Sequence, residues 1–343
     1  MYLMDLKNKN YRLLKTFIIT MLIILPIGLR SPNMGNDTEA YINIFYDCNK
    51  YENFFEPFLR YEMGYIILNR LIGLIYLNHN FAFCVIAFLT VFPLVYISLK
   101  KSEMPIFSIN LILLLGFFGS YMNILRQSLA VTIIFISYFY FKDKKYFKYA
   151  LLVLLATSMH KTGLFGLLII PISLIKFNSF NESIAIYFTL FIVLSFNYIL
   201  KLLAIIFPQY AHYFSGSYFD GTGRLAMAFN VIFLLVIIVL IEIYRRKYFK
   251  DNEQASKSTF FDWMPYILLC LFLIGFRANI VDRITSYFSI LLIIYLPNFA
   301  YRLNDKDKRI FMMVTCVSLA IKIVTIMYLR PEWNHILPYE FFF

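Results

Sequence analysis

Residues 146–175, YFKYALLVLLATSMHKTGLFGLLIIPISLI, contain two apolar runs that are separated by a short polar centre. Each run is long enough, or nearly so, to cross the hydrocarbon core of a bilayer as a helix. His160 and Lys161 lie between the two runs. The stretch therefore predicts a helical hairpin in a membrane. The side of the membrane on which this hairpin turns decides what His160 can do.

The composition of the whole chain supports this interpretation. Of its 343 residues, 61% are hydrophobic and only 15% are charged, whereas a soluble domain carries about 25% charged residues. No water-soluble core could bury so much apolar surface, so we expect an all-α polytopic membrane protein. The net charge of +12 then describes the orientation of the loops in the membrane. We expect the lipid bilayer, and no nucleic acid, as a partner.

The apolar runs predict about 11 transmembrane helices, at 14–29, 81–99, 105–121, 125–141, 146–159, 163–176, 182–199, 225–244, 261–277, 284–300 and 310–328. Loops rich in lysine mark the cytoplasmic face, and they lie at 7–15, 100–101, 142–148, 244–257 and 301–309. All of them can be cytoplasmic at once only if the short run 63–78, which carries Arg70, does not cross the bilayer. We therefore expect 63–78 to be a re-entrant or interfacial helix.

This topology places the N-terminus in the cytoplasm and the C-terminal segment, residues 330–343, outside. We expect a single integral membrane domain, residues 1–343, with long outer loops at about 30–62 and 200–224. The turn that holds His160 also lies on the outer face.

Arginines are frequent on this outer face, although the positive-inside rule would not place them there. The set consists of Arg30, Arg60, Arg126, Arg224, Arg277, Arg283 and Arg330. One explanation is that each side chain snorkels or pairs with a loop carboxylate, which suits Arg60 and Arg330. The other is a site for an anion, because a planar guanidinium binds carboxylate or phosphate with two parallel hydrogen bonds. We favour the anion site for the set as a whole.

Two stretches carry the strongest candidates. In YMNILRQSLAVTIIF (121–135), Arg126 lies at the outer start of a helix, where free backbone N–H groups favour an anion. In GFRANIVDRITSYF (275–288), Arg277, Asp282 and Arg283 surround a tight outer turn. The alternatives are a snorkelling Arg126 and an Asp–Arg pair that only pins two helix ends.

Two further outer segments hold supporting candidates. The stretch GLRSPNMGNDTEAYINIFYD (28–47) contains Arg30 and Asp37, and SGSYFDGTGRLAMAF (215–229) is a glycine-rich loop that contains Arg224. Such loops often move as lids over a substrate. The sequence has no nucleotide-binding or zinc-protease motif, and its histidines are dispersed. We therefore expect no metal and no cofactor.

Three segments resemble the EpsG family of polysaccharide polymerases. They are GLRSPNMGNDTEAYINIF, the block NILRQSLAVTIIFISYFYFKDKKYFKYALLVLLATSMHKTGLFGLLIIPI and the C-terminal ILPYEFF. The resemblance covers nearly the whole chain, and its most specific part is the block from Arg126 to His160. It implies a Wzy-type polymerase of O-antigen, capsule or exopolysaccharide in the bacterial inner (cytoplasmic) membrane. Such proteins resemble metal-independent glycosyltransferases of the GT-C kind.

The resemblance also implies the substrates. The growing glycan would leave undecaprenyl diphosphate and be transferred to a sugar hydroxyl of the incoming lipid-linked repeat unit, so donor and acceptor are both undecaprenyl-diphosphate-linked oligosaccharides. A chain-length regulator protein is a further candidate partner. A lipid-linked oligosaccharide ligase or another membrane glycosyltransferase is an alternative, as is a flippase or transporter. The transporter is less favoured, because the chain has no clear internal repeat and its charges gather at one face.

For this chemistry we expect Arg126, Arg277 and Arg283 to bind the leaving diphosphate, with Arg224 and Arg30 as supporting contacts. Preorganised donors of this kind stabilise the charge that develops on a leaving group. A base within hydrogen-bond reach would activate the acceptor hydroxyl, and His160 is the first candidate and Asp37 the second. Alternatively, His160 binds phosphate as an imidazolium.

Overall fold

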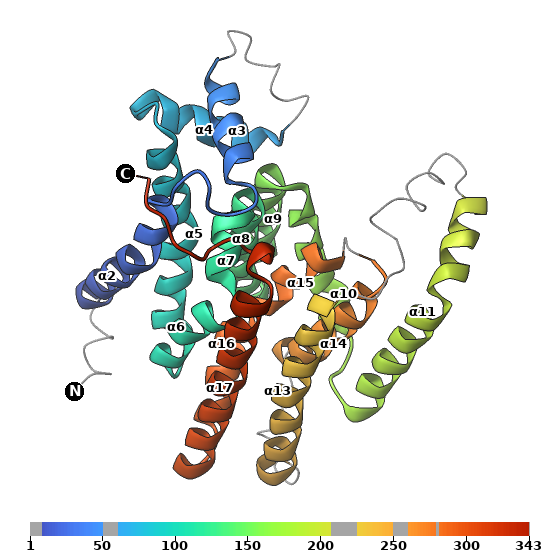
Figure 1. Ribbon diagram of the computed structural model, residues 1–343. Helices are drawn as coiled ribbons and strands as arrows, with labels where there is room; N and C mark the ends of the chain where they lie inside the picture. Colours follow the sequence, from blue (N-terminus) through green and yellow to red (C-terminus); the bar gives the residue numbers. More distant parts are fainter. Residues whose placement is uncertain (1–8, 51–60, 207–224, 250–259, 279–280, 343) are drawn as a thin grey trace. The chain divides into compact units, whose positions relative to one another are not determined.

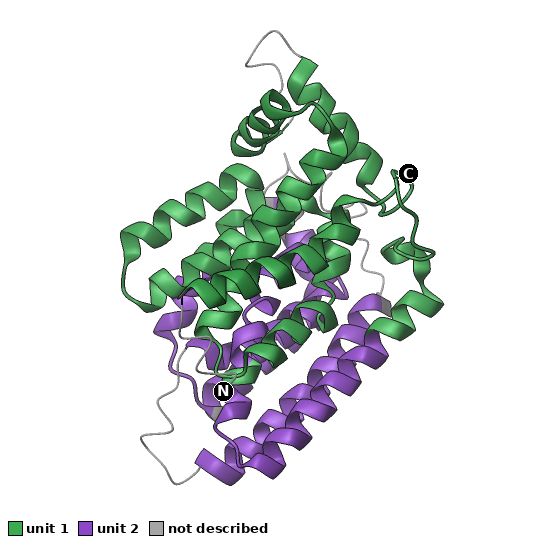
Figure 2. Cartoon of the chain, turned by 90° about the vertical axis from the view of Figure 1, so that its left-hand side faces the viewer, with its two compact units in different colours: residues 1–167, 296–298, 323–343 green, residues 168–295, 299–322 purple. Residues whose placement is uncertain are grey.

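The structure, a computed structural model, describes residues 9–50, 61–206, 225–249, 260–278 and 281–342. These residues form helices and connecting turns, and the extended pairing among them is one isolated bridge between Arg30 and Phe341. The chain forms two compact units, shown in Figure 2. Unit 1 comprises residues 1–167, 296–298 and 323–343, and unit 2 comprises residues 168–295 and 299–322. Each unit is described by itself below.

Figure 1 shows the helices in chain order. The first part of the chain contains α2 (Lys9–Gly28), α3 (Thr38–Lys50), α4 (Met63–Ile75), α5 (His79–Lys101), α6 (Pro105–Leu114), α7 (Phe117–Asn123), α8 (Leu125–Lys142), α9 (Tyr146–Met159) and the 3-10 helix η2 (Lys161–Leu168). The second part contains α10 (Ile169–Leu174), α11 (Ser179–Ile206), α13 (Leu225–Phe249), η5 (Phe260–Trp263), α14 (Met264–Gly275), α15 (Asp282–Ser289), α16 (Leu292–Tyr301), α17 (Asp305–Leu329) and η7 (Pro331–Trp333).

The predicted class is confirmed: the chain is an all-helical, multi-pass membrane protein. Within the described ranges, six helices are long and apolar enough to span a membrane, or up to seven if the bent pair α6–α7 is one span. They agree with the predicted runs 14–29, 81–99, 182–199, 225–244, 284–300 and 310–328, and the bent pair agrees with 105–121. The remaining predicted spans fall on α8 and on the shorter segments Tyr146–Met159, Lys161–Leu174 and Phe260–Gly275. The total of about 11 and the GT-C arrangement stay predictions.

Helix α4 has the dimensions of an interfacial helix. Its 13 residues give a length of about 20 Å, whereas the hydrocarbon core is about 30 Å thick. Large apolar side chains at its end are exposed, with Leu74 at 84% and Ile75 at 76%. That the run 63–78 does not cross the bilayer stays a prediction.

The predicted outer loop 30–62 contains a helix, α3, which packs on α4 and α5. Tyr41, Phe45 and Cys48 on one face of α3 join Tyr65 of α4 and Phe83 of α5 in one buried cluster. The buried positions of α3 recur every three to four residues, as an amphipathic helix requires. This packing holds α3 and the start of α4 beside the ends of α8 and α9.

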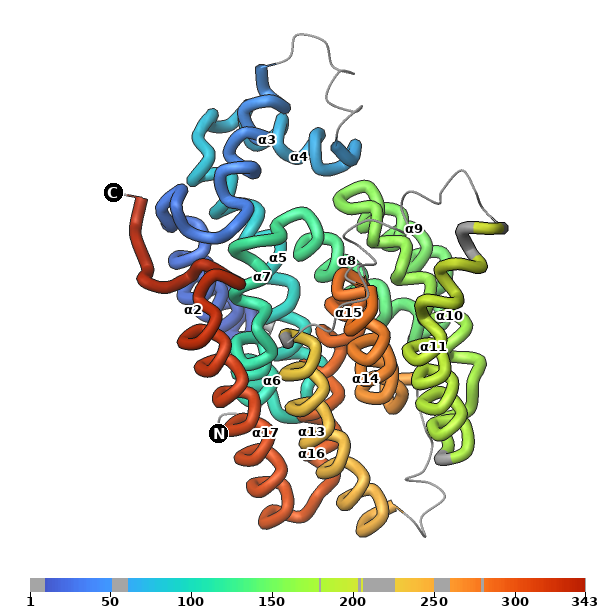
Figure 3. The backbone as a smooth tube through the Cα atoms, turned by 45° about the vertical axis from the view of Figure 1, so that its right-hand side comes forward, coloured from blue at the N-terminus to red at the C-terminus, as the bar shows by residue number. Residues whose placement is uncertain are grey.

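The turn at the centre of the predicted hairpin is present in unit 1, where the Tyr149 hydroxyl of α9 donates to the Gly166 carbonyl at 2.8 Å, but the segment after the turn begins differently. Helix α9 lies beside α8 (Figure 3), and His160 ends α9 in an extended conformation. The chain then continues as the 3-10 helix η2 instead of an α-helix. Packing is close at this turn: a Cβ on Gly163 would lie 2.6 Å from the backbone of Ala156, so glycine lets the chain rest against α9.

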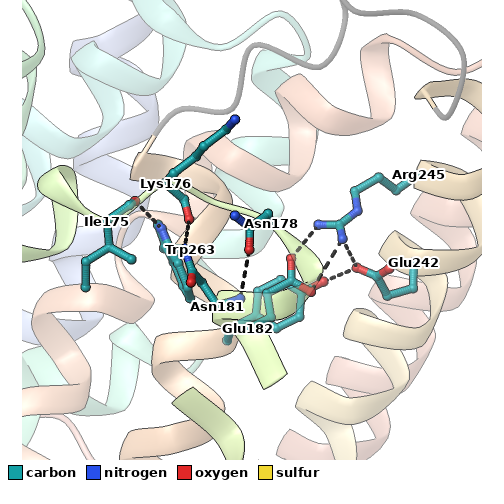
Figure 4. A network of polar contacts seen from close by, with 9 residues as sticks. Ile175, Lys176, Asn178, Asn181, Glu182, Glu242, Arg245 and Trp263 are labelled. Carbon is teal, nitrogen blue, oxygen red and sulfur yellow. Dashed lines mark hydrogen bonds and ion pairs between the residues drawn. The ribbon is translucent and has the colours of Figure 1, made fainter. Parts of the chain in front are cut away.

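In unit 2, a polar network joins α11 to α13 (Figure 4). Arg245 Nη1 donates to Glu182 Oε1 at 2.9 Å, and Arg245 Nη2 lies 3.4 Å from Glu242 Oε1. Tyr266 also donates to Glu242. The Phe177 ring lies against the guanidinium at 4.7 Å. The network adds polar contacts to the packing of α11 on α14.

Candidate functional site

Glu62, directly before α4, connects two of the predicted site residues. Its Oε2 accepts a hydrogen bond from Arg126 Nη1 at 2.6 Å, and its Oε1 accepts one from the Lys161 backbone N–H at 3.3 Å. Arg126 is the second residue of α8, and Lys161 directly follows His160. One carboxylate therefore holds the start of α8 beside the turn of the α8–α9–η2 hairpin. We call Glu62, Arg126, His160, Tyr41, Tyr61 and Tyr65 the Glu62 cluster, and all of it lies within unit 1.

Aromatic rings surround the Arg126 guanidinium. Its carbon lies 5.8 Å from the Tyr61 ring centre and 5.9 Å from that of Tyr65, both within the range of a cation–π contact. Tyr41 is also close enough to Arg126 to interact with its charge. Burial raises the pKa of Tyr41 above its ordinary value of 10, although the Arg126 charge opposes this shift. Tyr41 is therefore a neutral phenol at physiological pH.

One N–H donor of the Arg126 guanidinium forms no hydrogen bond to the described residues. Its Nε atom is buried and has no hydrogen-bond partner within the described part of the chain, although the side chain as a whole is 23% exposed. An unsatisfied buried donor costs about 1–3 kcal/mol. Such a group calls for an explanation, and a bound anionic oxygen would satisfy this one.

His160 is oriented by the turn in which it lies. Its Nδ1 is 2.6 Å from Thr162 Oγ1 and 3.3 Å from the Thr162 backbone nitrogen. Because a backbone N–H can only donate, Nδ1 acts as the acceptor in this second contact. A neutral imidazole then carries its proton on Nε2. This geometry favours a hydrogen-bond donor at Nε2 over a proton acceptor.

Two glycines allow these elements to approach one another. A Cβ on Gly64, in the first turn of α4, would lie 2.9 Å from the Met159 side chain at the end of α9. Gly163 plays the corresponding role between η2 and α9, as described above. Glycine at these two positions allows the start of α4, which follows Glu62, and η2, which follows His160, to pack closely against α9.

Arg30 has a different environment. It is fully buried, and its guanidinium donates to the Thr38 hydroxyl at 3.1 Å, to the Met122 carbonyl at 3.1 Å and to the Ile27 carbonyl. Its charged carbon lies 4.4 Å from the Phe83 ring centre. Burial lowers the pKa of Arg30 to about 10, so the side chain stays protonated at neutral pH. We assign Arg30 to the scaffold and leave it out of the proposed site. Its predicted contact with a diphosphate is untested.

The C-terminal tail completes this scaffold. The Tyr339 hydroxyl donates to the Pro26 carbonyl at 2.6 Å, and the Ser31 N–H donates to the Glu340 carbonyl at 2.9 Å. Asn123 Oδ1 accepts the Asn36 N–H at 2.5 Å. The family-like segments near residues 28–46 and 336–342 are therefore neighbours in space.

The other predicted residues lie elsewhere. Asp37 is exposed, directly before α3. In unit 2, the half-buried Arg277 follows α14, and the exposed Asp282 and Arg283 begin α15. Their convergence with Arg126 stays a prediction. Arg224 and Arg60 lie outside the described residues. Arg330 pairs with Glu332 at 3.5 Å, as the explanation by a loop carboxylate expects.

Sequence reasoning missed Glu62, the residue that connects the cluster. It was included only as the last position of the outer loop 30–62. One feature of the sequence points to Glu62: it is a carboxylate immediately before an apolar helical run, where an acidic side chain favours the start of a helix. Its partners are 64 and 99 positions away along the chain, so the signal did not identify them.

The fold and the Glu62 cluster together define a multi-pass helical membrane protein with a polar site built at the ends of apolar helices. Sequence comparison specifies the class further. The chain matches the EpsG family over residues 13–341, nearly its whole length. It therefore belongs to this family of Wzy-type polymerases. No curated protein and no solved structure matches the chain.

Proposed function

We propose that the protein polymerises lipid-linked oligosaccharide repeat units at the outer face of the bacterial cytoplasmic membrane. A sugar hydroxyl of the incoming unit attacks the anomeric carbon of the growing glycan. The bond between that carbon and undecaprenyl diphosphate breaks, and a glycosidic bond forms. The products are a longer lipid-linked glycan and a free lipid diphosphate. The step needs no metal in this proposal, because the arginines stabilise the charge of the leaving group.

The observation that carries the proposal is the unsatisfied Nε–H of Arg126. Glu62 fixes one side of the guanidinium, and the opposite donor is available for a diphosphate oxygen. A donor held in advance at the position of developing charge contributes most to catalysis, because it needs no reorganisation during the reaction. That Arg277, Arg283 and Arg224 also contact this diphosphate stays a prediction from the sequence.

The orientation of His160 favours one of its two candidate roles. Nδ1 accepts from Thr162, so the imidazole donates through Nε2–H, a group suited to a phosphate oxygen or to a hydroxyl of the acceptor sugar. We assign His160 to substrate binding. Asp37, exposed before α3, then becomes the first candidate for the base that receives the hydroxyl proton.

Reconstitution tests the function directly. Purified protein in liposomes, supplied with one lipid-linked repeat unit, is expected to produce glycans of increasing length together with free lipid diphosphate. A ligase would need a different acceptor and would add the glycan once. A transporter would move the unit across the bilayer without forming a glycosidic bond. Either of these results, with no polymer, would contradict the proposal.

Replacing Glu62 by glutamine is expected to slow polymer formation about tenfold. The variant keeps the size of the side chain and an oxygen for Arg126. However, it loses the charge that makes this hydrogen bond roughly twice as strong as a neutral one. A weakening of about 1.4 kcal/mol at the transition state corresponds to a factor of ten in rate. The rate of polymer formation in liposomes measures the effect.

Glu182→Gln is the matched control, because Glu182 also pairs with a half-buried arginine, Arg245, but in unit 2. It is expected to change stability and leave the rate per folded molecule near that of the wild type. An equal loss of rate in both variants would assign the effect of Glu62→Gln to stability.

A further inference from the structure

A second feature of unit 1 lies between the last turns of α5 and α8. It is a half-open cavity of about 390 Å³. Its inner wall is apolar and includes Pro93, Ile97 and Ile136, and its rim includes Lys100, Lys101 and Lys145. None of these residues belongs to the Glu62 cluster. The cavity therefore combines an aliphatic interior with a cationic entrance.

The rim carries a surplus of positive charge. Asp143 is the one acidic residue of the lining, against three lysines, and it lies 3.9 Å from Lys145. Among the described ion pairs, Lys100 and Lys101 have no carboxylate partner. Their ammonium groups lie instead over the rings of Tyr96, at 5.7 Å, and Phe139, at 5.9 Å. All three lysines are exposed, so an anion can reach them.

The depth of the cavity matches the headgroup of a membrane lipid together with the adjoining part of its acyl chains. Lys100 and Lys101 are the last residues of α5, one of the helices long enough to span a bilayer. At 1.5 Å per residue, Pro93 lies about 10 Å below this rim along the helix. The charged entrance is thus at the level of lipid headgroups, and the aliphatic wall lies in the hydrocarbon region.

We infer that this cavity binds an acidic phospholipid. Its phosphate lies at the lysine rim, and the part of an acyl chain nearest the headgroup lies along Ile97 and Ile136. Basic pockets between transmembrane helices are suited to such headgroups. The lysines also lie near helix C-termini, whose partial negative charge they offset. That role would not require a cavity with an aliphatic wall. A soluble anion would likewise make no use of the wall, so the shape selects a lipid.

Spin-labelled lipids test this inference on the full-length protein in phosphatidylcholine nanodiscs. A labelled phosphatidylglycerol is expected to be immobilised more than a labelled phosphatidylcholine. The combined variant Lys100→Gln, Lys101→Gln, Lys145→Gln should reduce that preference about tenfold, since each lysine near a membrane surface attracts anionic lipid. Ile136→Trp, which fills the cavity, should release the immobilised lipid while the lysines remain.

A charge-matched control replaces Lys176, Lys306 and Arg309 by glutamine, because these exposed residues lie outside the lining. It should leave the preference unchanged. An equal loss in both triple variants would assign the preference to general surface charge and overturn the inference. In a final experiment, glycerol phosphate is added as a soluble competitor of the lipid headgroup. Full displacement of the lipid by glycerol phosphate, with no effect of Ile136→Trp, would show that the rim binds a phosphate group alone and would likewise overturn it.

Discussion

Arg126→Ala is expected to reduce polymer formation by about 100- to 1,000-fold, the usual cost of removing one preorganised donor from an anionic transition state. The variant loses the Nε–H that we assign to the diphosphate and the partner of Glu62. Long chains should disappear from cells that carry this variant, and single repeat units should remain on the surface lipid. The amount of protein in the membrane and the length of the surface glycans measure the two effects separately.

The Arg126→Ala variant also leaves the Glu62 carboxylate, whose side chain is 10% exposed, without its cation. Removing one member of a buried pair is strongly destabilising, so a loss of folded protein could imitate a loss of chemistry. The double variant Arg126→Ala, Glu62→Gln removes this unpaired charge. It is expected to recover stability and to stay inactive. Recovery of long chains in the double variant would assign Arg126 to the scaffold.

Arg126→Lys distinguishes charge from geometry. A lysine can still pair with Glu62, but it cannot also direct a second donor at a fixed angle. We expect normal insertion and a loss of activity close to that of alanine. Polymer of ordinary length in Arg126→Lys would show that only the positive charge is needed.

Arg30→Met is expected to lower the free energy of unfolding by about 3–5 kcal/mol, because it leaves several buried acceptors without a donor and each such loss costs about 1–3 kcal/mol. Methionine fills part of the space, but the carbonyls of Ile27 and Met122 and the Thr38 hydroxyl lose their common donor. Thermal unfolding in detergent should show a decrease of about 6–20 °C in Tm, at roughly 2–4 °C per kcal/mol for a chain of this order of size.

Arg330→Met is the control for this comparison. Arg330 is 48% exposed and pairs with the exposed Glu332, and surface pairs of this kind contribute about 0–1 kcal/mol. Its Tm should stay within about 4 °C of the wild type. If Arg30→Met unfolds at the same temperature as Arg330→Met, then Arg30 does not hold α2, α3 and α7 together, and a contact with substrate becomes the better explanation for it.

The prediction of membrane class from sequence succeeded because partition into hydrocarbon is a local property. Each apolar side chain contributes to the hydropathy of its own segment, so spans such as 81–99 and 225–244 can be found without knowledge of their neighbours. The shape of each element was harder to predict. Residues 161–168 form a 3-10 helix in which Gly163 meets the backbone of α9, and neither feature is visible in the hydropathy of the run.

The candidate site divides in the same way. The sequence identified Arg126 and His160, since each ionisable side chain interrupts or ends an apolar run. Only the tertiary structure showed that Glu62 holds Arg126 beside the turn that contains His160, and that Arg30 is enclosed by Ile27, Thr38 and Met122. The physical reason is that hydrogen bonds and burial depend on which distant segments pack together. A side chain's charge is fixed by its residue type, whereas its partners are fixed by the packing of the helices.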